Sequence, residues 1–285
     1  MGTTRQIRNQ IKSAKNIAKI TKAMQMVAAS KMKRAQDQAQ SSRSYSEGIS
    51  QLAYLLSQKI DPALHPLLTQ PPNESGEIVL LIAPEKGLCG SLITSLARQI
   101  VESYPNPSSL EFVAIGKKAK NILKRFQAKT IAEFDIGISQ PKFDLVPPIA
   151  TIIKERFLSQ EIGKASAIYT NFINTMVQKP QKINLLPLSL IKKDSEIIPG
   201  EYLFEPSAEN ITAAVLQMYL ENQIYQLLLD AYASEQSARM VAMKNATDNA
   251  KSLMSSLTQS YNKARQASIT TEIIDIATAS MVLGQ

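Results

Sequence analysis

Apolar residues in the first part of the chain recur with the spacing of a coiled-coil helix. From Arg5 to Ser57 there is no proline and one glycine, Gly48, so nothing in this stretch stops a long helix. The apolar positions step by three or four residues, and they are Ile7, Ile11, Ala14, Ile17, Ile20, Met24 and Val27. We therefore predict one long helix in which these residues form the seam, the stripe that packs against a partner helix.

The last part of the chain repeats this pattern over a longer stretch. Between Ser207 and Leu283 there is neither proline nor glycine, Ser207 is a suitable N-cap, and Gly284 is a suitable stop. The candidate seam residues are Ile211, Val215, Met218, Tyr225, Leu228, Tyr232, Ala250, Leu253, Leu257, Tyr261 and Ala264. One apolar stripe does not stabilise a long helix in water, so we expect the two terminal helices to pair antiparallel as a left-handed coiled coil.

The middle of the chain alternates between strand and helix patterns. Strands are predicted at 78–83, 112–115, 130–134, 165–172 and 182–188, and helices at 91–103, 117–126 and 148–158. This βαβ alternation predicts an open five-stranded α/β sheet. All 14 prolines lie between Pro62 and Pro206, and turn residues gather at both ends of the middle segment. The predicted organisation is a helix at 1–60, a linker at 61–76, an α/β domain at 77–190, a linker at 191–206 and a helix at 207–285.

Positive charge is concentrated in the first helix. The chain carries a net charge of +8, and residues 1–40 alone hold nine basic residues and one acid, Asp37. A solvated helix face normally mixes charges of both signs, so this face indicates an acidic partner surface. A basic coil bound to nucleic acid stays open, although the aromatic residues that stack on bases are missing from this segment.

The loop after the first strand lies where α/β proteins bind phosphate groups. Its sequence, EKGLCGS at residues 85–91, has two glycines and fits neither a dinucleotide fingerprint nor a P-loop. A tight turn or a partner contact is therefore favoured over a nucleotide site.

Few residues are suited to metal, redox or membrane chemistry. The single cysteine, Cys89, excludes an internal disulfide and is interpreted as structural, and with one histidine, His65, there is no Cys/His metal set. The cysteine content fits a reducing cytoplasm. No apolar run approaches the ~20 residues of a membrane span, and the basic first 25 residues are not expected to act as a signal peptide.

Four blocks of the sequence resemble the gamma subunit of rotary F-type ATP synthases. They are Lys19–Lys31 (KITKAMQMVAASK), the loop Gly87–Gly90 (GLCG) with Glu85 where an aspartate is usual, Glu235–Asn249 (EQSARMVAMKNATDN) and Arg265–Glu272 (RQASITTE). The resemblance spans the chain, with one departure at Ala279-Ser280, where the family has a Gly-Ala pair. It implies an antiparallel coiled coil of the N- and C-terminal helices with a central Rossmann-like α/β domain.

The same resemblance implies a role as the central rotor shaft, which couples proton flow through a membrane ring to ATP synthesis. The implied partners are the alpha and beta subunits of the catalytic hexamer, the epsilon subunit and the membrane c-subunit ring, with no nucleic acid, no cofactor, no metal and no active site on this chain. The implied location is peripheral, at the cytoplasmic face of a bacterial plasma membrane. Beta-subunit contacts are implied for Lys22, Met24, Lys31, Lys86, Cys89, Arg239, Arg265, Gln266 and Thr270, and ring contacts for Tyr202, Phe204 and Glu205.

Two other interpretations stay open from the residues alone. A basic coiled-coil protein that binds nucleic acid would show a steep salt dependence of DNA binding. An α/β enzyme with helical arms would bind nucleotide as the isolated chain.

Overall fold

The computed structural model describes residues 4–59, 65–69, 71, 76–137, 140–189, 205 and 207–283. It divides into two compact units, which we treat separately. The coil unit comprises Met1–Ala28 and Met240–Gln285, and the α/β unit comprises Ala29–Arg239.

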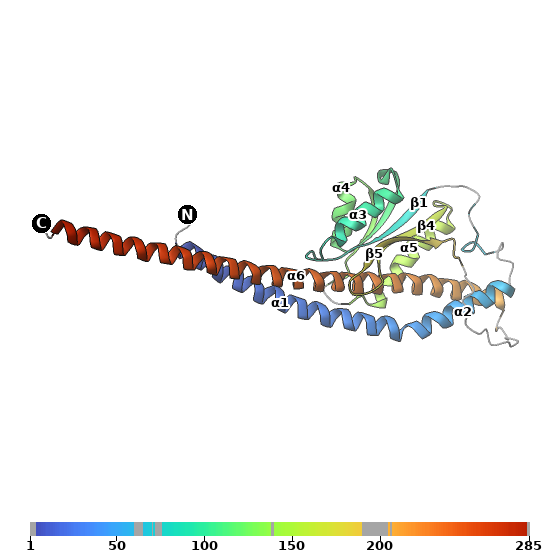
Figure 1. Ribbon diagram of the computed structural model, residues 1–285. Helices are drawn as coiled ribbons and strands as arrows, with labels where there is room; N and C mark the ends of the chain where they lie inside the picture. The colour runs from blue at the N-terminus through green and yellow to red at the C-terminus, as the bar shows by residue number, and fades with distance from the viewer. Residues whose placement is uncertain are drawn as a thin grey trace. The chain divides into compact units, whose positions relative to one another are not determined.

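Three helices form the two ends of the chain, α1 (Thr4–Ser41), α2 (Arg43–Lys59) and α6 (Ala208–Leu283) (Figure 1). The prediction of a single first helix was wrong at Ser42, where a turn separates α1 from α2. The hydroxyls of Ser41 and Ser42 donate to the backbone carbonyls of Gln38 and Ala39 at 2.9 and 3.2 Å. Such side-chain bonds to the backbone compete with a regular helix. Helix α6 begins at Ala208, directly after Ser207.

In the coil unit, α1 and α6 run antiparallel, as predicted. The hydroxyls of Thr21 and Thr247 share a buried hydrogen bond of 2.7 Å. Nearer the start of α1, Ala14 lines one groove together with Leu257 of α6. Earlier residues of α1 thus lie beside later residues of α6, which is the antiparallel arrangement.

After Ala14, the seam of α1 in the coil unit is made of smaller residues than predicted. A regular heptad repeat of buried and half-buried positions runs through Ile7, Ile11, Ala14, Ala18, Thr21, Gln25 and Ala28 on α1 and Met243, Thr247, Ala250, Met254, Leu257, Tyr261 and Ala264 on α6. It confirms the predicted seam positions Ile7, Ile11 and Ala14 on α1 and Ala250, Leu257, Tyr261 and Ala264 on α6. The prediction was wrong for Ile17, Ile20, Val27 and Leu253, which are 51, 60, 57 and 52% exposed. Small side chains allow two helices to approach closely, and the larger apolar residues are left on neighbouring faces.

In the α/β unit, five strands form one sheet in the order β3-β2-β1-β4-β5. The strands are β1 (Glu77–Ile82), β2 (Glu111–Ile115), β3 (Lys129–Phe134), β4 (Lys164–Phe172) and β5 (Gln178–Leu186). All pairs are parallel except β4 with β5. The sheet confirms the predicted open five-stranded α/β domain.

Helices cover both faces of this sheet (Figure 1). On one face, α3 (Leu92–Ser103) and α4 (Lys117–Arg125) pack on alternate residues of the strands, such as Val79, Leu81 and Phe112. On the other face, α5 (Val146–Leu158), α2 and the first half of α6 pack on residues such as Ile78 and Leu80. Two short 3-10 helices lie at Pro107–Ser109 and Phe143–Leu145.

The terminal helices also run antiparallel within the α/β unit. The amide of Gln226 on α6 donates to the hydroxyls of Ser42 and Ser46, each at 2.9 Å, and Ser46 also bonds to Asn222 at 3.0 Å. The prediction of Met218 as a seam residue was wrong, because it is 49% exposed, whereas Val215, Leu228 and Tyr232 are buried. Most of the two predicted linkers lies outside the described residues.

Candidate functional site

The candidate site lies at the carboxyl end of β1, where the strand order reverses. From β1 the chain reaches β2 on one side through α3, while β4 pairs on the other side. In open α/β sheets, the crevice at such a reversal is the usual place for a ligand. The loop that follows β1, residues 83–91, lies there, and Leu88 and Gly90 have φ angles of 63° and 61°.

Helix α6 fills this crevice. Ala231, Tyr232 and Glu235 of α6 line it together with the last residues of β1 and with Thr170 of β4. Two small cavities remain, of about 10 and 40 Å³. Sites for small organic ligands have volumes of ~300–1,000 Å³, so the crevice as described has room for water and not for a nucleotide.

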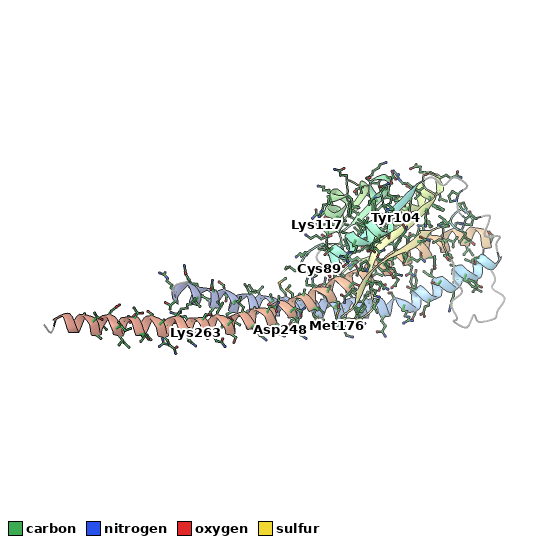
Figure 2. The ribbon with its side chains drawn as sticks, turned by 45° about the horizontal axis from the view of Figure 1, so that its top comes forward. Cys89, Tyr104, Lys117, Met176, Asp248 and Lys263 are labelled. Atoms are coloured by element: carbon green, nitrogen blue, oxygen red, sulfur yellow. The ribbon has the colours of Figure 1, made fainter. Side chains whose placement is uncertain are left out.

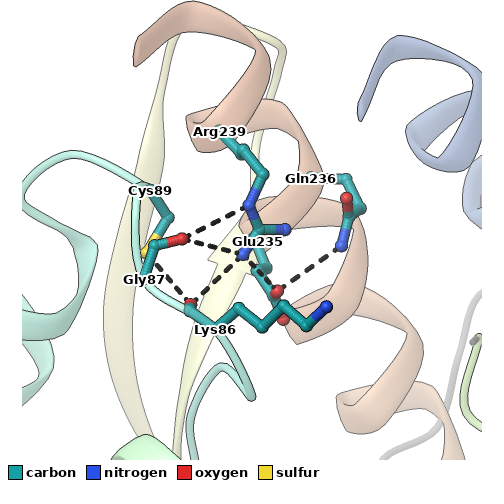
Figure 3. Close-up of polar contacts among 6 residues, drawn as sticks. All are labelled: Lys86, Gly87, Cys89, Glu235, Gln236 and Arg239. Atoms are coloured by element: carbon teal, nitrogen blue, oxygen red, sulfur yellow. Dashed lines mark hydrogen bonds and ion pairs between the residues drawn. The ribbon is translucent and has the colours of Figure 1, made fainter. Parts of the chain in front are cut away.

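Arg239 joins α6 to the loop after β1 (Figure 3). Its guanidinium donates to the backbone carbonyls of Lys86, at 3.2 Å, and Gly87, at 3.2 and 3.4 Å. One turn earlier on α6, the carboxylate of Glu235 accepts from the same guanidinium at 2.7 Å. Only 11 and 9% of the Arg239 and Glu235 side chains are exposed, so this ion pair is largely removed from water.

Burial and neighbouring charges act in opposite directions on Glu235. Burial raises the pKa of its carboxyl, while the positive charges of Arg239 and Lys31 lower it. The amide of Gln236 also donates to this carboxylate, at 3.5 Å. Breaking a buried pair of this kind is costly, because the remaining charge is left without compensation. Arg239, Glu235 and the loop carbonyls therefore act as one latch, which we call the loop latch.

Cys89 is a structural residue of the same loop. The side chain is buried, and its thiol faces the carbonyl of Lys86 at 4.0 Å. Burial raises the pKa of the thiol, so the reactive thiolate form is disfavoured. A role as a nucleophile does not fit this environment.

The structure brings together one group of the residues singled out from the sequence. Lys31, Lys86 and Arg239 line the 40 Å³ cavity with Glu85 and Glu235. Lys86 is exposed and Lys31 is half-buried, whereas Cys89 and Arg239 are covered by the chain itself.

The other predicted contact residues lie elsewhere. In the coil unit, Lys22, Arg265, Gln266 and Thr270 are exposed and Met24 is half-buried. Glu205 is exposed, and Tyr202 and Phe204 lie outside the described residues.

Sequence reasoning from composition and spacing missed Glu235 as the partner of Arg239. The two residues are four apart on a helix, which is the spacing of an ion pair, but that spacing is common on solvated faces. Their burial depends on a loop about 150 residues earlier in the chain, and no local sequence pattern predicts this burial.

Two classes of site are missing from the residues that the structure describes. No group of three or more His, Cys, Asp or Glu side chains in this part of the chain is arranged to hold a metal ion. Likewise, no helix among these residues combines the length and the apolar character needed to cross a membrane.

Comparison with known proteins gives a consistent result over the whole chain. A family model described as ATP synthase matches residues 3–283. The ATP synthase gamma chain of Methylacidiphilum infernorum is 43% identical over 297 residues, and that of Roseiflexus castenholzii is 38% identical over 290 residues. Each alignment covers 100% of this chain and 100% of the relative.

Solved structures share the fold. A chain in the OSCP/F1/c-ring structure of the Euglena gracilis mitochondrial ATP synthase superposes with a TM-score of 0.66 at 20% identity, over 98% of this chain and 94% of that chain. A chain in the central stalk and c-ring of the Tetrahymena thermophila enzyme gives a TM-score of 0.59 at 24% identity, over 80 and 99% of the two chains.

Proposed function

The chain belongs to the ATP synthase gamma-chain family, and on that premise we propose that it is the central rotor shaft of an F-type ATP synthase. In this role it transmits torque between a membrane ring driven by protons and three catalytic beta subunits. Proton flow is thereby coupled to ATP synthesis. The chain itself is proposed to be non-catalytic.

The observation that carries this proposal is the apolar surface of the coil unit. Ile17, Ile20 and Val27 form an exposed stripe on α1. Ile269, Ile273 and Ile276 form a second stripe on α6 and are 42, 61 and 70% exposed. Contiguous apolar stripes on a soluble protein are normally covered by a partner. An apolar sleeve formed by the catalytic hexamer fits both stripes.

The polar residues of the coil unit supply further contacts in this proposal. We assign Lys22, Met24, Arg265, Gln266 and Thr270 to contacts with the beta subunits. Beside the loop latch, we assign Lys31 and the exposed Lys86 to further beta-subunit contacts. Arg239 and the buried Cys89 hold the loop that contains Lys86.

The foot of the shaft is proposed to contain Tyr202, Phe204 and the exposed Glu205, in contact with the membrane ring. The epsilon subunit completes the rotor. The chain is placed at the cytoplasmic face of a bacterial plasma membrane, held there by these subunits.

The energy that the shaft must carry favours many contacts over one. If about three charges cross about 150 to 200 mV for each nucleotide, the work is ~10 to 14 kcal/mol. One exposed ion pair contributes ~0 to 1 kcal/mol, so torque has to be shared along the apolar stripes and the basic residues around them.

Rotation of the assembled complex tests the proposal directly. Because the one native cysteine is buried, a Gln127→Cys variant offers a single exposed thiol in the α/β unit for an optical probe. With the catalytic subunits fixed to a surface, ATP should drive net rotation of the probe in one direction. The unsubstituted complex, treated with the same probe, is the labelling control. A probe that only fluctuates while ATP is hydrolysed would refute the role of rotor.

A further inference from the structure

The solvent face of α4 is a surface of one charge sign. Its nine residues, KKAKNILKR, contain five basic residues and no acid. At about 100° per residue, the basic positions and Asn121 cover an arc of about 160°, and the opposite side is buried as Ala119, Ile122 and Leu123. We call Lys117, Lys118, Lys124 and Arg125 the basic face of α4.

Nothing in the described part of the chain neutralises this face. Lys120, at its edge, pairs with Glu133 of β3, and none of the four residues of the basic face pairs with a described carboxylate. Lys117, Lys124 and Arg125 are exposed, and Lys118 is half-buried. Lys117 is labelled at the start of α4 in Figure 2. The face is thus available to an external anion.

Its composition favours a lipid surface over a protein. Protein interfaces are centred on aromatic or apolar anchors and are poor in lysine, and the arc of α4 offers only cations and one amide. Anionic headgroups attract each nearby cation, and this attraction does not require complementary shapes. We propose that the basic face of α4 binds the anionic headgroups of a phospholipid bilayer. The contact is electrostatic, weak for each side chain and sensitive to salt.

Vesicle binding by the full chain tests this proposal. The test variant replaces Lys117, Lys118, Lys124 and Arg125 by glutamine. The matched control replaces Arg8, Lys12, Lys15 and Lys19 by glutamine, which removes four exposed charges from α1. Vesicles of phosphatidylcholine mixed with phosphatidylglycerol are compared with vesicles of phosphatidylcholine alone, at low and at high salt.

Each cation at an anionic surface changes partitioning about fivefold, so the α4 variant should lose at least a factor of ten in binding to the mixed vesicles. The loss should exceed that of the α1 control and should disappear at high salt or without phosphatidylglycerol. Equal losses in the two variants would mean that only net charge matters, and would overturn the proposal.

A second outcome would also overturn it. If the α4 variant binds vesicles normally but an acidic subunit is lost from the purified complex, the basic face is a protein contact. Both variants should keep their fold, because seven of the eight substituted side chains are exposed and Lys118 is half-buried, and circular dichroism checks this.

Discussion

The two units of this chain differ in how they bury large apolar side chains. In the α/β unit large side chains fill the core of the sheet, and Phe112 and Phe157 are only 0 and 2% exposed. In the coil unit the most buried residues of α1 are alanines, while Ile20 is 60% exposed. The core of the first unit thus encloses its largest apolar side chains, whereas the helix pair of the second leaves Ile17 and Ile20 on its surface.

This difference separates a domain that completes its own core from one that does not. The sheet has helices on both faces, so its apolar residues are covered by the chain. Two helices can cover only one stripe of each other, and a second apolar stripe on either helix must be covered by another protein. The exposed residues of the coil unit are thus better indicators of a partner than the buried ones.

The largest expected effect comes from the core of the α/β unit. Phe112→Ala should reduce the free energy of unfolding by about 3–5 kcal/mol, because a fully buried ring is replaced by a cavity. The matched change in the coil unit, Ile20→Ala, should change stability by less than about 0.5 kcal/mol in the isolated chain. Urea unfolding of both variants measures the difference. Comparable losses would show that Ile20 is buried in solution and would remove the contrast between the units.

A second prediction tests the small residues of the helix pair. Ala35 of α1 is 0% exposed and packs on Tyr232 and Ala233 of α6. Ala35→Leu should overpack this contact and reduce stability by about 1–3 kcal/mol. The same change at the exposed Ala23 should be nearly neutral. Thermal unfolding distinguishes them, and a neutral Ala35→Leu would mean that the close approach of the helices is not required.

A third prediction concerns Asp230, a half-buried carboxyl group of the α/β unit. Burial raises the pKa of the Asp230 carboxyl to about 6, against an ordinary value of 3.8. Because the folded pKa is the higher one, the stability from this group is fully present below about pH 4 and is lost as the pH rises through about 6. Asp230→Asn should therefore be more stable than the natural chain by about 1–3 kcal/mol at neutral pH, and equal to it in acid.

The matched control for Asp230 is Asp248 in the coil unit, which is labelled in Figure 2 and has a side chain that is 59% exposed. Asp248→Asn should change the free energy of unfolding by less than about 0.5 kcal/mol, because its side chain lies on the surface. Urea titrations at several pH values measure both variants. A constant gap between Asp230→Asn and the natural chain would contradict the assigned cause.

The order of elements could be predicted from the sequence almost completely. Strand patterns bounded by glycine and proline fixed β1 and β2 to within a residue at each end, because these strands are buried on both faces. The register of the coil could not be predicted, since two apolar stripes overlap on α1. The spacing alone favours the stripe with the larger side chains, and only the partner helix decides between them.

The candidate site was predictable only in part. The loop at residues 85–91 was singled out by its place after a strand, and Arg239 by its resemblance to a family motif. The burial of Glu235 and the filling of the crevice by α6 depend on contacts between distant segments. Long-range packing of this kind leaves no periodic signal, so the sequence favoured a tight turn or a partner contact at this loop and did not predict the internal latch with Arg239.

The smallest expected effect on stability is at the buried pair of Thr21 and Thr247, which lies in the seam of the coil unit. The hydroxyl of Thr21 also lies 2.9 Å from the carbonyl oxygen of Ile17, and that of Thr247 lies 2.8 Å from the carbonyl oxygen of Met243. One threonine hydroxyl can therefore donate to the other, while the second donates to a backbone carbonyl of its own helix. Either single change to valine removes the shared bond and should cost about 1 kcal/mol.

The double change to valine removes both polar groups while it keeps the shape, so it should cost less than the sum of the singles, with a coupling of about 0.5–1 kcal/mol. Urea unfolding of the natural chain, the two single variants and the double variant completes this double-mutant cycle. A cysteine pair at exposed positions of α1 and α6 provides a second measurement, because a coil freed from its polar pair can slip by one heptad and form the wrong crosslink. If the double variant is neutral and crosslinks in the native register, packing of the alanines alone sets the register. If it is neutral and slips, the threonines give specificity without stability, and the small seam does not by itself determine which apolar residues face outward.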